Sequence, residues 1–130
     1  MDTNKFIVKK SATGLGLYAA TPIKKDEFVM EYTGRMLTID EANKKGGKYL
    51  FEVNSRWTID GSDRKNTARY INHSCRPNCE VNIVNKKVKI KSIKNIRAGE
   101  EITYDYGKEY FDEYIKPFGC KCKHCLEKLS

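Results

Sequence analysis

The chain has 130 residues, of which 39% are hydrophobic and three are proline, so it is long enough for one globular domain and too apolar for a disordered segment. Its apolar runs are short, which predicts neither a membrane-spanning helix nor a signal peptide. The formal net charge of +8 leaves room for an anionic partner such as nucleic acid. A lysine-rich solvated surface is the simpler explanation, because no arginine-rich tract or nucleic-acid motif is present.

Short strands dominate the predicted elements. Stretches of β-branched and aromatic residues, bounded by charged residues or glycine, are typical of strands. In chain order these strands cover residues 6–9, a short apolar stretch after a tight loop at residues 14–16, and residues 28–33, 49–53, 57–60, 80–84 and 87–93.

One short helix interrupts the strands. Thr38 and Glu41 have the Thr-x-x-Glu spacing of a capping box, and Gly46 and Gly47 supply a stop. The sequence therefore predicts a helix over residues 39–45.

Two hairpins complete the pattern, with turns at Asn54-Ser55 and Asn85-Lys86. The inward face of the second hairpin is predicted to carry Val81, Ile83, Val88 and Ile90. Many short strands without a βαβ rhythm indicate a mostly-β protein and exclude a doubly wound nucleotide-binding fold. The Gly-Leu-Gly at residues 14–16 is no dinucleotide fingerprint, because the third glycine and the following helix are missing.

The most informative stretches are RYINHSCRPNC at residues 69–79, GEEITYDYG at residues 99–107 and the closing CKCKHC at residues 120–125. With GLG, EYTG and YLF earlier in the chain, they resemble the SET domain and post-SET zinc segment of protein-lysine methyltransferases, in a minimal stand-alone form. The resemblance implies a SET-domain (β-clip) fold of small curved sheets with a pseudoknot over residues 1–112. It implies a zinc-binding post-SET tail over residues 113–130.

The implied reaction is methyl transfer from S-adenosylmethionine to the amine of a lysine in a protein. The resemblance assigns Tyr106 as the catalytic tyrosine near the methyl group, Tyr104 as the aromatic residue that tunes how many methyl groups are added, and Tyr32 as a pocket tyrosine that contacts the amine. Packing in the core is the ordinary role of a tyrosine in a strand, and the chain has eight tyrosines. Their places in three ordered motifs favour the functional interpretation.

The resemblance also implies a set of cofactor-binding residues. The amide side chain of Asn72 would meet the methionyl portion, and the main chain of His73 would meet adenine. Glycines at residues 14–16 permit close approach of the backbone. The full set is Thr13, Gly14, Leu15, Gly16, Tyr49, Asn72, His73 and Lys121, with core packing as the alternative role of Tyr49. Asp60 and Arg69 are expected to order the surrounding loops.

Five cysteines, an odd number gathered late in the chain, favour metal binding in a reducing compartment over a disulfide framework. Three thiolates within six residues suit tetrahedral Zn²⁺. The resemblance implies Cys75 as the fourth ligand and Cys79 as a structural thiol. The spacing from Cys122 to Cys125 is shorter than is usual in the family, which makes His124 an alternative ligand. The predicted ligands are Cys75, Cys120, Cys122 and Cys125.

The charge pattern suggests a basic substrate. Residues 86–97 carry six basic residues and no acidic one, whereas residues 100–113 carry six acidic residues and one lysine. A histone tail or a similar basic peptide would be attracted to the acidic stretch, although a solvated acidic face explains it equally well. The resemblance implies an intracellular protein, at chromatin in a eukaryotic or host cell and cytoplasmic otherwise. The alternatives are an inactive SET-type peptide-binding module and a zinc-stapled basic nucleic-acid-binding protein.

Overall fold

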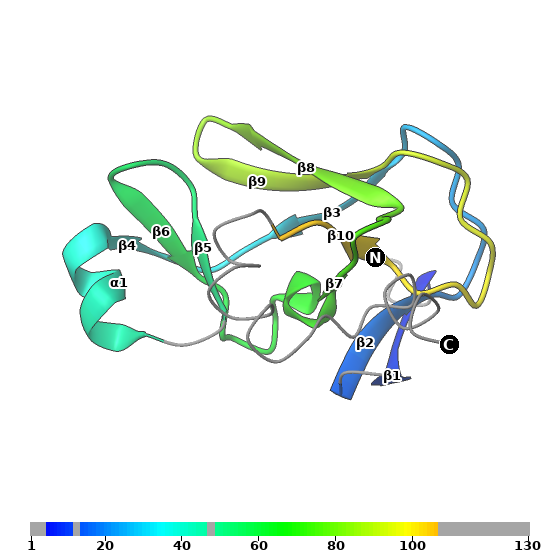
Figure 1. Ribbon diagram of the computed structural model, residues 1–130, viewed down its shortest axis with the longest axis horizontal. Coiled ribbons are helices and arrows are strands. Elements are labelled where there is room, and N and C mark those ends of the chain that lie inside the picture. The colour runs from blue at the N-terminus through cyan, green and yellow to red at the C-terminus, as the bar shows by residue number, and fades with distance from the viewer. Residues whose placement is uncertain (1–4, 12–13, 47–48, 107–130) are drawn as a thin grey trace. The chain divides into compact units, whose positions relative to one another are not determined.

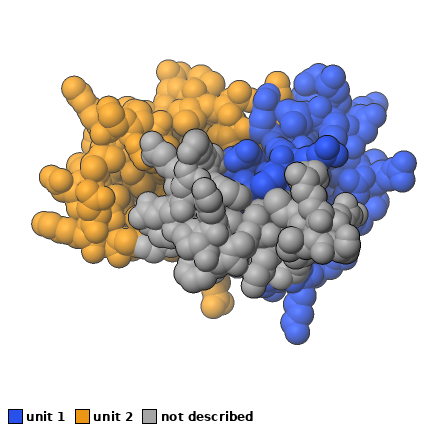
Figure 2. Space-filling view, viewed as in Figure 1, with its two compact units in different colours: residues 1–27, 70–80, 92–130 blue, residues 28–69, 81–91 orange. Residues whose placement is uncertain are grey.

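The computed structural model describes residues 5–11, 14–46 and 49–106, and its elements are mostly short strands (Figure 1). The chain divides into two compact units, which Figure 2 shows in different colours. Unit 1 comprises residues 1–27, 70–80 and 92–130, and unit 2 comprises residues 28–69 and 81–91.

Unit 1 contains two small pairs of strands. The antiparallel pair is β1 (Phe6–Ser11) with β2 (Gly14–Ala19), and the parallel pair is β7 (Asn72–His73) with β10 (Thr103–Tyr104). Main-chain hydrogen bonds from Ala19 to Glu100 and from Ile102 to Leu17 tie the late segment to β2. The buried side chains are mostly aliphatic: Leu17, Ala19, Ile23, Ile71, Ile96 and Ile102.

Unit 2 begins with β3 (Phe28–Tyr32), followed by β4 (Arg35–Thr38) and the helix α1 (Ile39–Lys45). The helix has the predicted bounds and the predicted capping box, because Thr38 and Glu41 exchange side-chain to main-chain hydrogen bonds. Strands β5 (Leu50–Glu52) and β6 (Trp57–Asp60) form the predicted hairpin, and β4 adds to it to give the order β4-β6-β5.

A second three-stranded sheet has the order β3-β9-β8, where β8 spans Cys79–Val84 and β9 spans Lys87–Ser92. Asn85 and Lys86 both have positive φ, of 51° and 65°, as a two-residue hairpin turn requires. Val88 and Ile90 are fully buried as predicted, but Ile83 is 46% exposed, so its predicted inward position is wrong. A pattern of alternation cannot foresee that β8 is exposed toward the hairpin turn while β9 stays covered.

One further expectation needs correction, and some short elements were not foreseen. Residues 14–16 belong to β2 instead of a loop before it, and they pair with residues 9–11 of β1. The short elements β4, β7, β10 and the 3-10 helix η2 (Thr67–Tyr70) were not predicted from the sequence. Within the described ranges, no helix is both long and apolar enough to cross a membrane.

Candidate active site

The parallel pairing of β7 with β10 brings the Asn-His motif beside the Tyr-Asp-Tyr motif. Thr103 is the register partner of Asn72, and Tyr104 is the partner of His73. The main-chain nitrogen of Ser74 donates to the carbonyl oxygen of Tyr104 at 3.2 Å, which extends the contact by one residue. Two motifs that lie far apart in the sequence therefore form one local structure.

Asn78 holds this structure in place and was missed by the sequence analysis. Its side chain is buried; Nδ2 donates to the carbonyl oxygen of Glu101 at 2.8 Å, and Oδ1 accepts from the main-chain nitrogen of Thr103 at 2.9 Å. The amide thus satisfies one donor and one acceptor of the late segment, as a neighbouring strand would. The sequence signal was the Pro-Asn pair inside the motif, which suggests only a turn.

Tyr106 lies against the same segment. Its hydroxyl donates to the carbonyl oxygen of Ile71, and its main-chain nitrogen donates to Nδ1 of His73 at 3.1 Å. The Tyr106 ring centroid is 5.0 Å from that of Tyr104 and 5.5 Å from that of His73. Because the phenol proton is directed at Ile71, the phenol oxygen enters any further polar contact as an acceptor.

The imidazole of His73 supports the main chain of Tyr106. Burial lowers the pKa of His73, and the Asp105 carboxylate opposes that shift only in part. Since Nδ1 accepts from Tyr106, the proton of the neutral ring lies on Nε2, which is 3.5 Å from Cys75 Sγ. His73 Nδ1 lies 3.8 Å from Asp105 Oδ1. Because the neutral imidazole carries no charge, this contact is not an ion pair.

The amide of Asn72 faces the glycine segment of β2. Its Nδ2 donates to the carbonyl oxygen of Leu15 at 3.0 Å, to Ser11 Oγ and to a carboxylate oxygen of Glu101. Two of the predicted cofactor-binding segments, residues 14–16 and residues 72–73, are thereby in direct contact. Thr13 lies outside the described residues.

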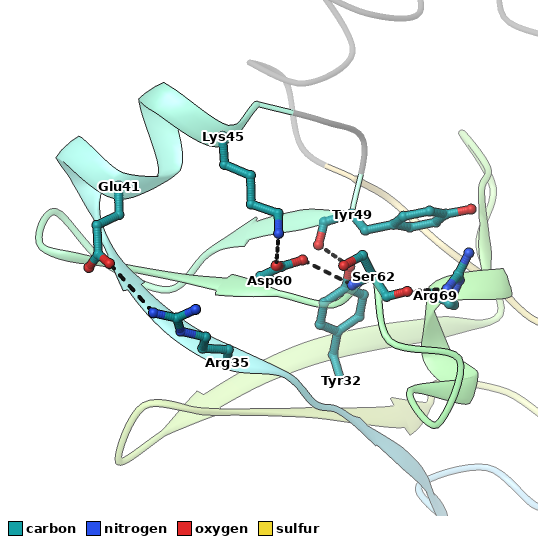
Figure 3. A network of polar contacts seen from close by, with 8 residues as sticks. All are labelled: Tyr32, Arg35, Glu41, Lys45, Tyr49, Asp60, Ser62 and Arg69. Carbon is teal, nitrogen blue, oxygen red and sulfur yellow. Dashed lines mark hydrogen bonds and ion pairs between the residues drawn. The ribbon is translucent and has the colours of Figure 1, made fainter.

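Two other predicted site residues, Tyr32 and Tyr49, contact each other within unit 2 (Figure 3). The buried Tyr32 hydroxyl donates to the carbonyl oxygen of Tyr49 at 2.7 Å, and the main-chain nitrogen of Gly61 donates to the same oxygen. A Cβ at Gly61 would lie 2.4 Å from the Tyr32 ring, so only glycine lets the ring pack there. The phenol of Tyr32 is thus fixed by main chain on one side and by the Phe51 ring, 5.3 Å away, on another.

The loops around these tyrosines are ordered by polar side chains. Figure 3 shows the Asp60 carboxylate between Lys45 Nζ, at 2.7 Å, and the main-chain nitrogen of Ser62. Arg69 donates to the carbonyl oxygen of Ser62 and places its guanidinium 4.2 Å from the centroid of the Tyr49 ring. These contacts fit the loop-ordering role expected for Asp60 and Arg69.

Asn66 is a second asparagine that the sequence analysis missed. It is 2% exposed; Nδ2 donates to the carbonyl oxygen of Gly61 and Oδ1 accepts from the main-chain nitrogen of Thr33, both at 3.0 Å. It joins the end of β3 to the loop after β6, as Asn78 joins segments in unit 1.

Only Cys75 among the predicted zinc ligands falls within the described residues, and its side chain is exposed. An exposed thiol fits a ligand that meets a metal held by another segment. Cys79 is buried, and burial raises the pKa of its thiol to about 12, which fits a structural role. Among the described residues no three potential ligands gather into a metal site. The tail residues Cys120, Lys121, Cys122, His124 and Cys125 lie outside the described part of the chain.

The chain belongs to the SET domain family, which matches residues 14–107. It is 36% identical, over 98% of its length, to histone-lysine N-methyltransferase 2D of Homo sapiens, and it spans 2% of that protein. It is 40% identical, over 90% of its length, to histone-lysine N-methyltransferase set-2 of Caenorhabditis elegans, and it spans 9% of that protein. The chain thus corresponds to a small part of these relatives.

The fold is likewise similar to that of a solved structure. A chain of the Chaetomium thermophilum polycomb repressive complex 2 superposes with a TM-score of 0.71 at 34% identity, covering 79% of this chain and 15% of that one. The mostly-β fold with small sheets expected from the sequence is therefore confirmed. The division at residues 112 and 113 stays a prediction, because the family match ends at residue 107.

Proposed function

We propose that this chain is an S-adenosylmethionine-dependent protein-lysine N-methyltransferase. The observation that carries the proposal is the pairing of β7 with β10, which joins the predicted cofactor anchor Asn72 to the strand that leads to Tyr106. The relatives from Homo sapiens and Caenorhabditis elegans are both named histone-lysine N-methyltransferases, which supports the same activity.

The chemical task is to present a neutral amine in line with a methyl group. A free lysine has a pKa of about 10.4, so only about one amine in a few thousand is neutral at pH 7. Burial in a narrow channel and a nearby sulfonium both disfavour the ammonium form, so no general base is required. What this chain must supply is alignment and a phenol acceptor, and Tyr106, with its proton directed at Ile71, is the residue we assign to that role.

The residues present fit a cofactor with a polar amino-acid end. Asn72 and the backbone of residues 14–16 would hold that end, the main chain of His73 would meet adenine, and Thr13, Tyr49 and Lys121 would complete the site. When bound, S-adenosylmethionine supplies an electrophilic methyl group. The chain's own contribution is to orient it and to exclude water around the phenols of Tyr104 and Tyr106.

We further propose a structural Zn²⁺ held by Cys75, Cys120, Cys122 and Cys125. Four thiolates match the ligand set of a closed, tetrahedral zinc site, in which the metal contributes to folding and not to the reaction. The exposed thiol of Cys75, next to the β7 strand, would anchor the tail of residues 113–130 beside the cofactor residues.

The proposed substrate is a histone tail or a similar basic peptide, and the proposed place of action is chromatin. The relatives' names support a histone substrate, and the acidic residues at 100–113 would attract a basic peptide. Monomethylation is the proposed main product. A phenol at Tyr104 can hold an ordered water in the space that a methylated amine would need.

The test is incubation with labelled S-adenosylmethionine and a panel of histones, followed by mass spectrometry of the products. We expect a labelled lysine with the unmutated protein and a loss of at least about tenfold in rate for Tyr106→Phe. The matched control is Tyr18→Phe, which also removes one phenol hydrogen bond, from Tyr18 to the carbonyl oxygen of Lys10. Peptide binding without any transfer would favour an inactive module, and salt-dependent DNA binding without cofactor binding would favour a nucleic-acid-binding protein.

A further inference from the structure

The side-chain nitrogen of Asn72 is surrounded by oxygen atoms from three separate segments. Nδ2 lies 2.9 Å from Glu101 Oε2, 3.0 Å from the carbonyl oxygen of Leu15 and 3.1 Å from Ser11 Oγ. A carboxylate and a main-chain carbonyl can only accept hydrogen bonds. The reversed amide would place its own oxygen against these acceptors, so the orientation of Asn72 is fixed by its neighbours.

Main-chain contacts hold Glu101 where its carboxylate accepts from the Asn72 amide. Its main chain forms an antiparallel bridge with Tyr18, and its carbonyl oxygen accepts from Asn78 Nδ2. Its negative charge acts on a neighbouring group: burial raises the pKa of Tyr18, and the Glu101 carboxylate raises it further. The carboxylate is therefore a fixed negative group beside the Asn72 amide.

Gly16 makes room for that carboxylate. A Cβ at this position would lie 2.6 Å from Glu101 Oε2, so the carboxylate would have to move. It would lie 3.1 Å from Asn72 Nδ2, which would have to give by a few tenths of an ångström. Gly16 does not have positive φ, so its backbone could accept another residue. Gly16 therefore lets the Glu101 carboxylate lie where it meets Asn72.

The opposite end of the Asn72 amide is available to a ligand. Among the described residues no group donates a hydrogen bond to Oδ1, which leaves this acceptor for a ligand. A hydrogen bond to a charged acceptor is stronger than one to a neutral acceptor, and it polarises the amide so that Oδ1 becomes a better acceptor. An acceptor at this point selects a ligand group that carries N–H donors.

We propose that Glu101 is a positioning residue that acts through Asn72 and makes the cofactor site selective for an ammonium group. This inference rests on the proposed function, because the ammonium is that of the cofactor's methionyl portion. Glu101 itself touches neither the cofactor nor the reacting atoms. Its replacement by glutamine would remove the charged acceptor and allow a side-chain N–H to face Asn72. Only the Leu15 carbonyl would then oppose reversal of the amide, so the preference of Oδ1 for a donor would weaken.

The experiment is calorimetric titration with two probes: S-adenosylhomocysteine, and an analogue in which its α-ammonium is replaced by hydrogen. We expect the unmutated protein to prefer S-adenosylhomocysteine by about tenfold or more. In Glu101→Gln the affinity for S-adenosylhomocysteine should fall by about tenfold while that for the analogue changes little, so the preference nearly disappears. Glu100→Gln is the matched control, since the Glu100 carboxylate accepts from the main-chain nitrogen of Arg97 and not from Asn72.

A second variant keeps the test decisive if Glu101→Gln does not fold. Gly16→Ala displaces the carboxylate without removing it and should reduce the same preference. A merely structural Glu101 would lower the affinities for both probes equally, and that result would overturn the role. Full preference in a folded Glu101→Gln or Gly16→Ala would overturn it as well. Failure of the unmutated protein to bind either probe would overturn the proposed function and this inference together.

Discussion

The two units are built in different ways. In unit 2, most elements pair with near neighbours in the sequence, as in the helix that follows β4 and the hairpin of β5 and β6. Unit 1 has one local hairpin, β1 with β2, among its described residues, but segments far apart also pair there, as β7 does with β10 and Ile23 does with Ile96. The residues that carry the proposed chemistry lie mainly in unit 1, where pairing between distant segments places groups from different motifs side by side.

Both units nevertheless use the same device to join their segments. Asn66 in unit 2 and Asn78 in unit 1 are buried, and each amide bonds to main chain at both of its ends. Such a side chain satisfies backbone groups that no strand partner reaches, so it stabilises irregular structure that hydrophobic burial alone would leave unpaired.

The largest loss of activity is expected from replacing Cys75, the predicted zinc ligand in unit 1. Cys75→Ser should remove a zinc ligand, lower the metal content from about one ion per chain and abolish methyl transfer, because the tail loses its anchor. Metal analysis and the transfer assay measure both changes. Cys79→Ala is the control, since this buried thiol is no predicted ligand and its loss should leave the zinc content unchanged. A fully active, metal-free protein would contradict the zinc assignment.

The two asparagines test whether the same device has different consequences in the two units. Asn66→Ala and Asn78→Ala should each lower the free energy of unfolding by about 2 to 4 kcal/mol, because each leaves one main-chain donor and one main-chain acceptor unsatisfied. Only Asn78→Ala should also weaken S-adenosylmethionine binding beyond the fraction of unfolded protein, because it frees the segment that carries Glu101 and Thr103. Chemical denaturation and calorimetry separate the two effects, and equal losses of binding would contradict the distinction.

Tyr104→Phe should change the product more than the rate. The phenylalanine cannot hold an ordered water through a hydroxyl, so a methylated amine would find room and di- and trimethyllysine should increase on the same peptide. Mass spectra of the product measure the ratio. Trimethyllysine as the main product of the unmutated protein would show that Tyr104 does not limit methylation.

The smallest effect concerns the acid stability of unit 2. The hydrogen bond from Lys45, aided by Ser62, holds the pKa of Asp60 below its ordinary value. A lowered pKa means that Asp60 contributes stability above its ordinary pKa and that this contribution is lost as the pH falls through the lower, folded value. Asp60→Asn should therefore be less stable near pH 7 and should lose less stability on acidification. Urea midpoints across this range test it, with Asp40→Asn, on the same helix as Lys45, as the control.

These differences explain what the sequence could predict. The helix over residues 39–45 and both hairpins depend on local signals, a capping box and turn residues, and the structure confirms them. The strands β7 and β10 are two residues each and have no periodicity, so only their partners define them. The roles of Asn66, Asn78 and Glu101 arise from contacts with distant main chain, which residue type and spacing do not reveal. The family resemblance supplied the motif residues but not these supports.

Hydrogen exchange with and without S-adenosylmethionine tests most directly whether unit 1 holds the cofactor at the β7–β10 pair. We expect slower exchange on cofactor binding in peptides that cover residues 14–19, 71–75 and 102–106. The helix α1 and the hairpin turn at Asn85 and Lys86 should exchange at unchanged rates. Protection confined to α1 and this hairpin turn, or no protection at saturating cofactor, would show that the cofactor does not bind at the β7–β10 pair.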